Sequence, residues 1–283
     1  CVKNLHFLSR KDFSDTLLGN NLRFLTFLHR AGIMGFRHLR TPMTDTHNNI
    51  PRPTIEELIK KDDAHYCSPE IADKGWCVKL VAVGNLPSRF GSFQVAAFYN
   101  NKDSKEHAAF VHGNVCGRTS VPVRVHSECL TGDAIGSLRC DCRDQLEESL
   151  KMIGEMDYGM VLYLRQEGRG IGLMNKIKAY QLQDDGYDTV EANEKLGFKD
   201  DERDYAIAAH MLASLDIKSI RLITNNPRKI ADLKQHGVEI VDRIPLEMKP
   251  NEYNAKYLQT KREKSGHLLG RLQEQMDDLK RST

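Results

Sequence analysis

Three cysteines, Cys129, Cys140 and Cys142, stand in a C-x10-C-x-C arrangement within the stretch "HSECLTGDAIGSLRCDC". Thiolates bind zinc strongly, and a structural zinc ion normally has four protein ligands. Three clustered cysteines would leave one position for water, whose pKa bound zinc lowers toward neutrality. The spacing therefore favours a zinc site open for hydrolysis. Two alternatives stay open: His126 or a distant cysteine could be a fourth ligand, or the C-x-C pair could be a redox pair.

A second group, "RQEGRGIG" from Arg165 to Gly172, directly follows the apolar run "MVLYL". Glycines let a backbone approach a ligand closely, and a turn from strand to helix points free N–H groups at anions. Arg165 and Arg169 carry guanidinium groups that suit phosphate oxygens, and Glu167 could accept the N1–H and amino group of a guanine. The motif indicates a nucleotide-binding loop, although an ordinary loop with a solvated charge cluster has the same composition.

Two further motifs could serve the same ligand. "TNNPRK", Thr224 to Lys229, follows the strand-like "RLI" and opens a helical pattern. Its two cations would lie beside a helix N-terminus, which suits a phosphate, but a plain helix cap with surface cations fits equally well. In "DDERD", Asp201 and Arg203 could be a catalytic acid/base and its electrophilic partner, or merely part of an acidic first turn of a helix.

The elements that must position these motifs change type along the chain. From about residue 76, β-prone runs over 77–86, 91–100, 107–113 and 121–129 are separated by Gly, Asn and Pro. After Cys142, helical patterns alternate with strand patterns, and the sequence therefore predicts an α+β (mixed α/β) fold with a β-rich first half. The expected helices are 143–157, 173–186, 202–216 and 228–236, and the expected later strands are 160–164, 219–224 and 238–246.

Composition narrows the class of protein. A net charge of +2 and 40% hydrophobic residues are typical of a folded protein and speak against a strongly basic nucleic-acid binder. No run approaches the ~18 consecutive apolar residues of a membrane span, and the first residues lack a signal-peptide core. We expect a cytoplasmic protein without nucleic-acid or membrane partners. Because the sequence begins with Cys, a lost targeting segment stays open.

Taken in order, "RVHSECLTGD", "LRCDC", "LRQEGRGIGLMNKIKAYQLQDDGYDTVEAN", "LGFKDDERDY" and "LITNNPRK" closely resemble GTP cyclohydrolase II, the enzyme that opens riboflavin biosynthesis. The resemblance runs from about residue 77 to Gly270. It implies an N-terminal extension of unknown role with a Pro-rich linker (1–75), a catalytic domain (76–270) and a charged C-terminal tail (271–283). Bifunctional relatives carry a 3,4-dihydroxy-2-butanone 4-phosphate synthase in front, but its "DDEDRENEGD"-type signature does not occur here, so we expect no synthase activity.

The resemblance also implies the reaction. One zinc per subunit, held by Cys129, Cys140 and Cys142 plus water, would deliver hydroxide to C8 of the guanine of GTP. Formate and, with Mg²⁺, pyrophosphate would leave, giving 2,5-diamino-6-ribosylamino-4(3H)-pyrimidinone 5′-phosphate. The family further suggests a homodimer. Other readings are a paralogue that stops at the formamide or serves another guanine-derived pathway, and a catalytically silent GTP- or zinc-binding module.

The family's site residues fall on matching positions of this sequence. Its proton acceptor falls on Asp201, and its proposed nucleophile toward the α-phosphate falls on Arg203. Tyr180 matches the tyrosine associated with deformylation, so we expect formate release. The GTP contacts would be Arg124, Val125, His126, Ser127, Glu128, Gln145, Glu167, Gly168, Arg169, Thr189, Thr224 and Lys229.

Overall fold

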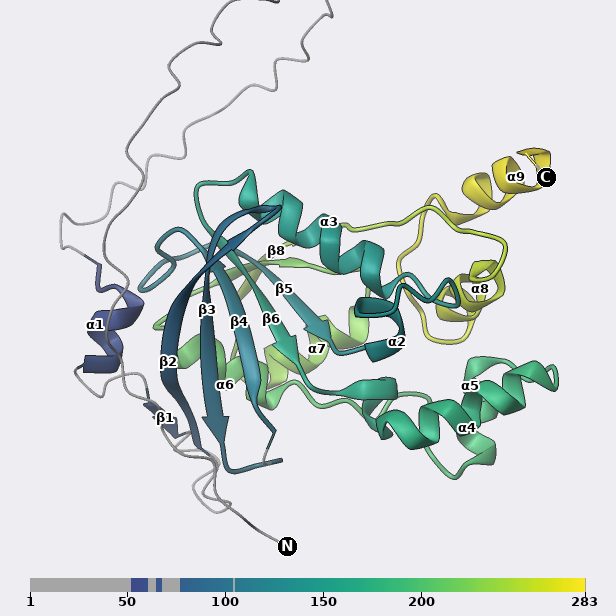
Figure 1. Cartoon of the computed structure of the whole chain (residues 1–283), viewed down its shortest axis with the longest axis horizontal. Coiled ribbons are helices and arrows are strands. Elements are labelled where there is room, and N and C mark those ends of the chain that lie inside the picture. The colour runs from purple at the N-terminus through teal and green to yellow at the C-terminus, as the bar shows by residue number, and fades with distance from the viewer. Residues whose placement is uncertain (1–51, 61–64, 68–76, 104, 283) are drawn as a thin grey trace, which may run out of the picture. The chain divides into compact units, whose positions relative to one another are not determined.

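The computed structural model describes residues 52–60, 65–67, 77–103 and 105–282, which belong to one compact unit spanning residues 50–283 (Figure 1). The N-terminal extension expected over 1–75 lies outside the described residues, except for 52–60 and 65–67. Among the helices of the described part, none is long and apolar enough to cross a membrane.

A mixed sheet forms the centre of this unit. Over the described residues it has eight strands in the order β1-β2-β3-β4-β6-β5-β7-β8. Neighbours from β1 to β6 pair antiparallel, whereas β5 pairs parallel with β6 and β7, and β7 pairs parallel with β8. The predicted mixed α/β fold with a β-rich first half is confirmed. The strands are β1 (His65–Cys67), β2 (Cys77–Ser88), β3 (Gly91–Asn100), β4 (His107–His112), β5 (Val121–Ser127), β6 (Gly159–Leu164), β7 (Ile220–Ile223) and β8 (Ile240–Ile244).

Helices cover both faces of the sheet. Leu162 of β6 packs in the larger hydrophobic cluster with Met211 of α6, while the next residue back along the strand, Val161, packs in the smaller cluster with Ile153 of α3. This alternation is the period of a strand that is buried on both faces. The helices are α1 (Ile55–Lys60), α2 (Leu130–Asp133), α3 (Cys142–Gly154), η2 (Glu167–Gly170), α4 (Gly172–Asp184), α5 (Thr189–Lys195), α6 (Ala206–Ser214), α7 (Pro227–Gln235), α8 (Ala255–Glu263) and α9 (Leu272–Ser282).

The three parallel strands β5, β6 and β7 bring the predicted motifs together. Each ends at the same edge of the sheet, because parallel strands share one direction. Cys129 follows β5, "RQEGRGIG" follows β6, and "TNNPRK" follows β7. In Figure 1, α2, α4, α5 and α8 lie beyond this edge, so segments more than a hundred residues apart in sequence are found there.

Helices α5 and α6 show where the expectation and the structure differ. Helix α5 was not predicted, although "DTVE" carries its signal: Asp188 accepts hydrogen bonds from the N–H groups of Val190 and Glu191, and Glu191 bonds back to Asp188. Helix α6 begins at Ala206 and not at residue 202, because the Asp204 carboxylate accepts the Ala206 N–H at 2.7 Å. The acidic "DDERD" run therefore precedes the helix and does not form its first turn.

Helix α1 packs into the same core as the sheet, although it precedes the expected catalytic domain. Ile55 and Leu58 are 3% and 7% exposed and belong to the larger hydrophobic cluster. A capping box starts the helix, since Thr54 and Glu57 exchange hydrogen bonds between side chain and backbone. The roles assigned to residues 1–75, 76–270 and 271–283 stay predictions.

We predict that Ile55→Ala lowers the free energy of unfolding by about 2–5 kcal/mol, because it leaves a cavity in the core. Lys60→Ala, at an exposed position of the same helix, should change it by less than about 0.5 kcal/mol. Denaturant unfolding measures both. Equal effects of the two variants would show that α1 does not contribute to the core in solution.

Candidate active site

A cavity of about 400 Å³ lies beyond the ends of β5, β6 and β7. Most residues expected at the site line it: Arg124, His126, Ser127, Glu128, Cys129, Cys140, Cys142, Gln145, Glu167, Gly168, Arg169, Tyr180, Thr189, Arg203, Thr224 and Lys229. Two expected residues do not. Val125 is fully buried and contributes its carbonyl oxygen to Lys229 Nζ at 2.6 Å, and Asp201 lies behind Arg203.

The three cysteines meet on one wall of the cavity. Cys129 precedes α2, and Cys142 is the first residue of α3, so two different helix starts hold the sulfurs together. All three Sγ atoms lie within 4.8 Å of one another, and those of Cys129 and Cys140 are 3.7 Å apart. Two sulfurs bound to one tetrahedral zinc at about 2.3 Å would be ~3.8 Å apart. The donor set and its spacing therefore fit a zinc ion.

His126 does not join this cluster. Its Nε2 lies 3.1 Å from both carboxylate oxygens of Asp133, and its ring stacks on Tyr163 at a centroid distance of 5.5 Å. The Tyr163 hydroxyl donates to Asp133 at 2.8 Å. His126 is thus held by a buried network around Asp133, whose Oδ2 also accepts the Cys129 N–H at 3.0 Å. Among the described residues, the metal-ligand set around Cys129 contains cysteines alone.

Lys176 of α4 reaches the cysteine cluster, which the sequence analysis did not foresee. Its side chain is 10% exposed, and its Nζ lies 3.2 Å from Cys129 Sγ and 2.7 Å from Glu167 Oε1. Hydrogen bonds from the other two thiols, together with the Lys176 charge, hold the pKa of the Cys129 thiol below its ordinary value despite burial. The signal was present in "KIKAY", because residues four apart on a helix face the same side: Lys176 lies one turn before Tyr180.

Glu167 ties the glycine-rich loop to the helix that follows Cys129. Its Oε2 accepts the Leu130 N–H at 2.6 Å, and its Oε1 accepts Lys176 Nζ and the Gly168 N–H. Gly168 and Arg169 both have left-handed φ angles, 63° and 59°, and Arg169 does so without being glycine. Such backbone is costly for a side-chain-bearing residue and is concentrated at functional sites.

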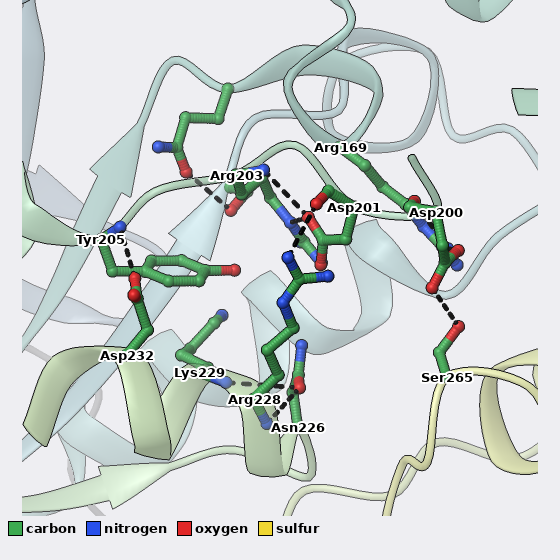
Figure 2. A network of polar contacts seen from close by, with 12 residues as sticks. Arg169, Asp200, Asp201, Arg203, Tyr205, Asn226, Arg228, Lys229, Asp232 and Ser265 are labelled. Carbon is green, nitrogen blue, oxygen red and sulfur yellow. Dashed lines mark hydrogen bonds and ion pairs between the residues drawn. The ribbon is translucent and has the colours of Figure 1, made fainter. Parts of the chain in front are cut away.

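Asp201 and Arg203 form a close ion pair next to the cavity (Figure 2). Arg203 donates from Nε at 2.8 Å and from Nη2 at 2.6 Å to the two oxygens of Asp201. Burial raises the pKa of the Asp201 carboxyl, but the hydrogen bonds and charge of Arg203 outweigh burial and place that pKa below its ordinary value. Arg228 of α7 donates to the Asp201 carbonyl at 3.0 Å. This contact holds the loop that carries Asp201 against the "TNNPRK" motif.

Positive charge is concentrated among the residues that line the same cavity. Lys229 is 4% exposed; burial first, and then the charges of Arg124 and Arg203, lower the pKa of its ammonium well below the ordinary value. Burial and the charges of Lys261, Arg169, Arg203 and Lys229 lower the pKa of His267 to about 3. Buried cations that repel one another gain most from an anionic ligand.

Tyr180 and Thr189 lie toward the side of the cavity formed by α4 and α5. The Tyr180 hydroxyl lies 3.2 Å from Thr131 Oγ1, and the guanidinium of Arg139 stacks 4.9 Å above its ring. Thr189 is the first residue of α5. A further wall comes from α8, where Tyr257, Thr260 and Lys261 line the cavity; the sequence analysis assigned no chemistry to this helix. The three thiols could hold a metal ion, and several cationic side chains line the same cavity.

A family model described as GTP cyclohydrolase II matches residues 79–245, which is more than half of the chain. The chain belongs to the GTP cyclohydrolase II family. The GTP cyclohydrolase-2 of Picrophilus torridus is 56% identical over 192 residues, which cover 68% of this chain and 100% of that protein. The GTP cyclohydrolase-2 of Campylobacter hominis is 57% identical over 192 residues, which cover 68% of this chain and 96% of that protein.

A longer relative is the riboflavin biosynthesis protein RibBA of Synechocystis sp. It is 59% identical over 242 residues, which cover 77% of this chain but 44% of that protein. This chain therefore spans less than half the length of that relative.

The lowered pKa of Asp201 predicts a pH dependence of stability. A carboxylate whose pKa is lower in the folded state stabilises the fold above its unfolded-state pKa, and this contribution is lost as pH falls from about 5. We predict that Asp201→Asn is less stable than wild type at pH 7 and that the difference narrows toward about pH 3. Urea unfolding measures this, with Asp185→Asn, at an exposed carboxylate, as a control that follows wild type. A constant difference across this range would contradict the prediction.

Proposed function

We propose that this protein is a zinc-dependent GTP cyclohydrolase II. It would open the imidazole ring of guanine at C8, release formate and pyrophosphate, and form 2,5-diamino-6-ribosylamino-4(3H)-pyrimidinone 5′-phosphate as the first step of riboflavin biosynthesis. The observation that carries the proposal is that three free thiols, with two of the sulfurs 3.7 Å apart, line the same cavity as several buried cations. Membership of the GTP cyclohydrolase II family supports GTP as the substrate.

The cysteines would hold the metal. When bound, zinc supplies a Lewis acid that lowers the pKa of a coordinated water and so provides a nucleophile near neutral pH. Cys129, Cys140 and Cys142 would be three ligands, which suits a catalytic site with an open position better than a closed structural one. Lys176 would offset part of the negative charge of three thiolates through its contact with Cys129.

The cationic side chains of the cavity would hold the triphosphate. Lys229, Arg203 and Arg169 line the cavity and would neutralise phosphate oxygens, and Mg²⁺ would accompany them. An ionised carboxylate has about four acceptor positions, and the chain's own donors use three on Glu167, so one remains for the guanine. Asp201, ionised at neutral pH because of its lowered pKa, would be the proton acceptor, and Arg203 would act toward the α-phosphate.

The remaining expectations belong to the same proposal. Residues 76–270 would form the catalytic domain, and two copies of the chain would associate as a homodimer in the cytoplasm. Further contacts to GTP would come from residues that line the cavity: Arg124, Ser127, Glu128, Gln145, Thr189 and Thr224.

Zinc-loaded protein incubated with GTP and Mg²⁺ should produce formate and pyrophosphate. Cys140→Ser should lose its zinc while keeping its fold. Its rate of formate release should fall by more than about a hundredfold, because loss of a metal ligand should cost more than loss of a residue that only orients a ligand. Cys116→Ala, at a buried free cysteine outside the cavity, should keep both zinc and turnover. Zinc content, formate assay and circular dichroism measure these outcomes. A folded, zinc-replete wild type that yields no formate would refute the proposal.

Tyr180 should be needed for the second hydrolysis. We predict that Tyr180→Phe opens the ring but accumulates a product that keeps its formyl group, because the hydroxyl that points to Thr131 is removed. Mass spectrometry of the product distinguishes the two species. Tyr158→Phe, outside the cavity, should release formate like wild type. Normal formate release by Tyr180→Phe would remove this role from Tyr180.

A further inference from the structure

A buried carboxylate lies between two of the three clustered cysteines. Asp141 separates Cys140 from Cys142 in sequence, is 2% exposed, and is the residue that precedes α3. A buried carboxylate is unfavourable unless charged or hydrogen-bonding groups compensate it. The identity of its partners therefore decides how the segment "CDC" is held.

Both oxygens of Asp141 have side-chain partners, one on α3 and one on α8. Oδ1 accepts Lys261 Nζ of α8 at 2.7 Å, and Oδ2 accepts Nε2 of Gln145. Gln145 in turn accepts Arg124 Nη2 at 2.5 Å, and Arg124 Nη1 donates to the Ile223 carbonyl of β7 at 3.1 Å. The segment that carries two cysteines is thus anchored on one side to the sheet and on the other to α8.

The contact between Asp141 and α8 is buried and is supported by a neighbouring side chain. Lys261 is 11% exposed at its side chain, and its ammonium also lies 4.4 Å from the centroid of the Tyr257 ring on the same helix. Tyr257, Thr260 and Lys261 all line the cavity together with Asp141 and Cys142. Residues 255–263 lie beyond the 79–245 region that the family model matches.

We propose that α8 is part of the metal centre, and that Lys261 is a positioning residue which holds the Asp141 carboxylate and thereby fixes the backbone that presents Cys140 and Cys142 to the metal. The inference rests on the proposed zinc site. Residues that orient metal ligands in this way commonly affect metal affinity about 10–100-fold. Without Lys261, the Asp141 carboxylate would turn toward water and displace the backbone between Cys140 and Cys142.

Lys261→Met tests the proposal, because methionine keeps most of the aliphatic length and removes the charge. Zinc affinity is measured by competition with a chelator, and the geometry of the site is read from the sulfur-to-cobalt charge-transfer absorption of the Co²⁺-substituted protein. We expect zinc to bind about 10–100-fold more weakly and the cobalt absorption to change. Arg262→Met removes the adjacent cation, whose partner Glu263 is half exposed at 51%, and should match wild type in both measurements.

A double variant separates positioning from charge balance. Lys261→Met with Asp141→Asn removes both charges of the Lys261–Asp141 ion pair, so its zinc-free form should be more stable in urea unfolding than the single variant. Its zinc affinity should nevertheless stay low, because the contact between α8 and the "CDC" segment is still missing. Recovery of full zinc affinity in the double variant would overturn the proposal, since Lys261 would then act only as a counter-charge.

Two further outcomes distinguish this inference from the proposed function. If wild type binds zinc through its three cysteines and Lys261→Met has the same zinc affinity and cobalt spectrum, the inference fails alone. If wild type binds no zinc at the cysteines, the inference and the zinc-dependent function fail together.

Discussion

The parallel pairing of β5 with β6 and β7 is the constraint on which the site depends. Each of these strands delivers a different chemical group at its carboxyl end: thiols after β5, the glycine-rich loop after β6, and buried cations after β7. The antiparallel strands β2 to β4 contribute to the hydrophobic core but supply no group to the cavity. Within the sheet, the cavity residues therefore belong to the parallel strands and to the segments that follow them.

Charged groups of both signs line the cavity. Lys176 contacts Cys129 and Glu167, while burial and the charges of Arg124 and Arg203 lower the pKa of Lys229 well below its ordinary value. Buried like charges are unfavourable for folding and favourable for binding an ion of opposite charge. Under the proposed function, a metal cation would offset the charge of the thiolates and a phosphate anion would offset that of the buried cations.

Much of this could be predicted from local patterns. The strands from 77 to 127 follow from β-prone runs and turn residues, and the three cysteines and the "RQEGRGIG" loop follow from residue type and spacing. Contacts between distant segments could not be predicted in this way. Lys176 meets Cys129 across 47 residues, and Lys261 meets Asp141 across 120 residues. The predicted start of α6 was wrong because a single side chain, Asp204, decides where the helix begins.

The two outermost strands of the described sheet have a consequence for how copies of the chain can meet. The strand β1 is three residues long, and β8 is five residues long with exposed Asp242 and half-buried Arg243 within it. Short and charged edge strands are poor templates for backbone pairing with another molecule. Association between copies would therefore rely on contacts between side-chain surfaces, and the sheet would end within each molecule instead of continuing across an interface.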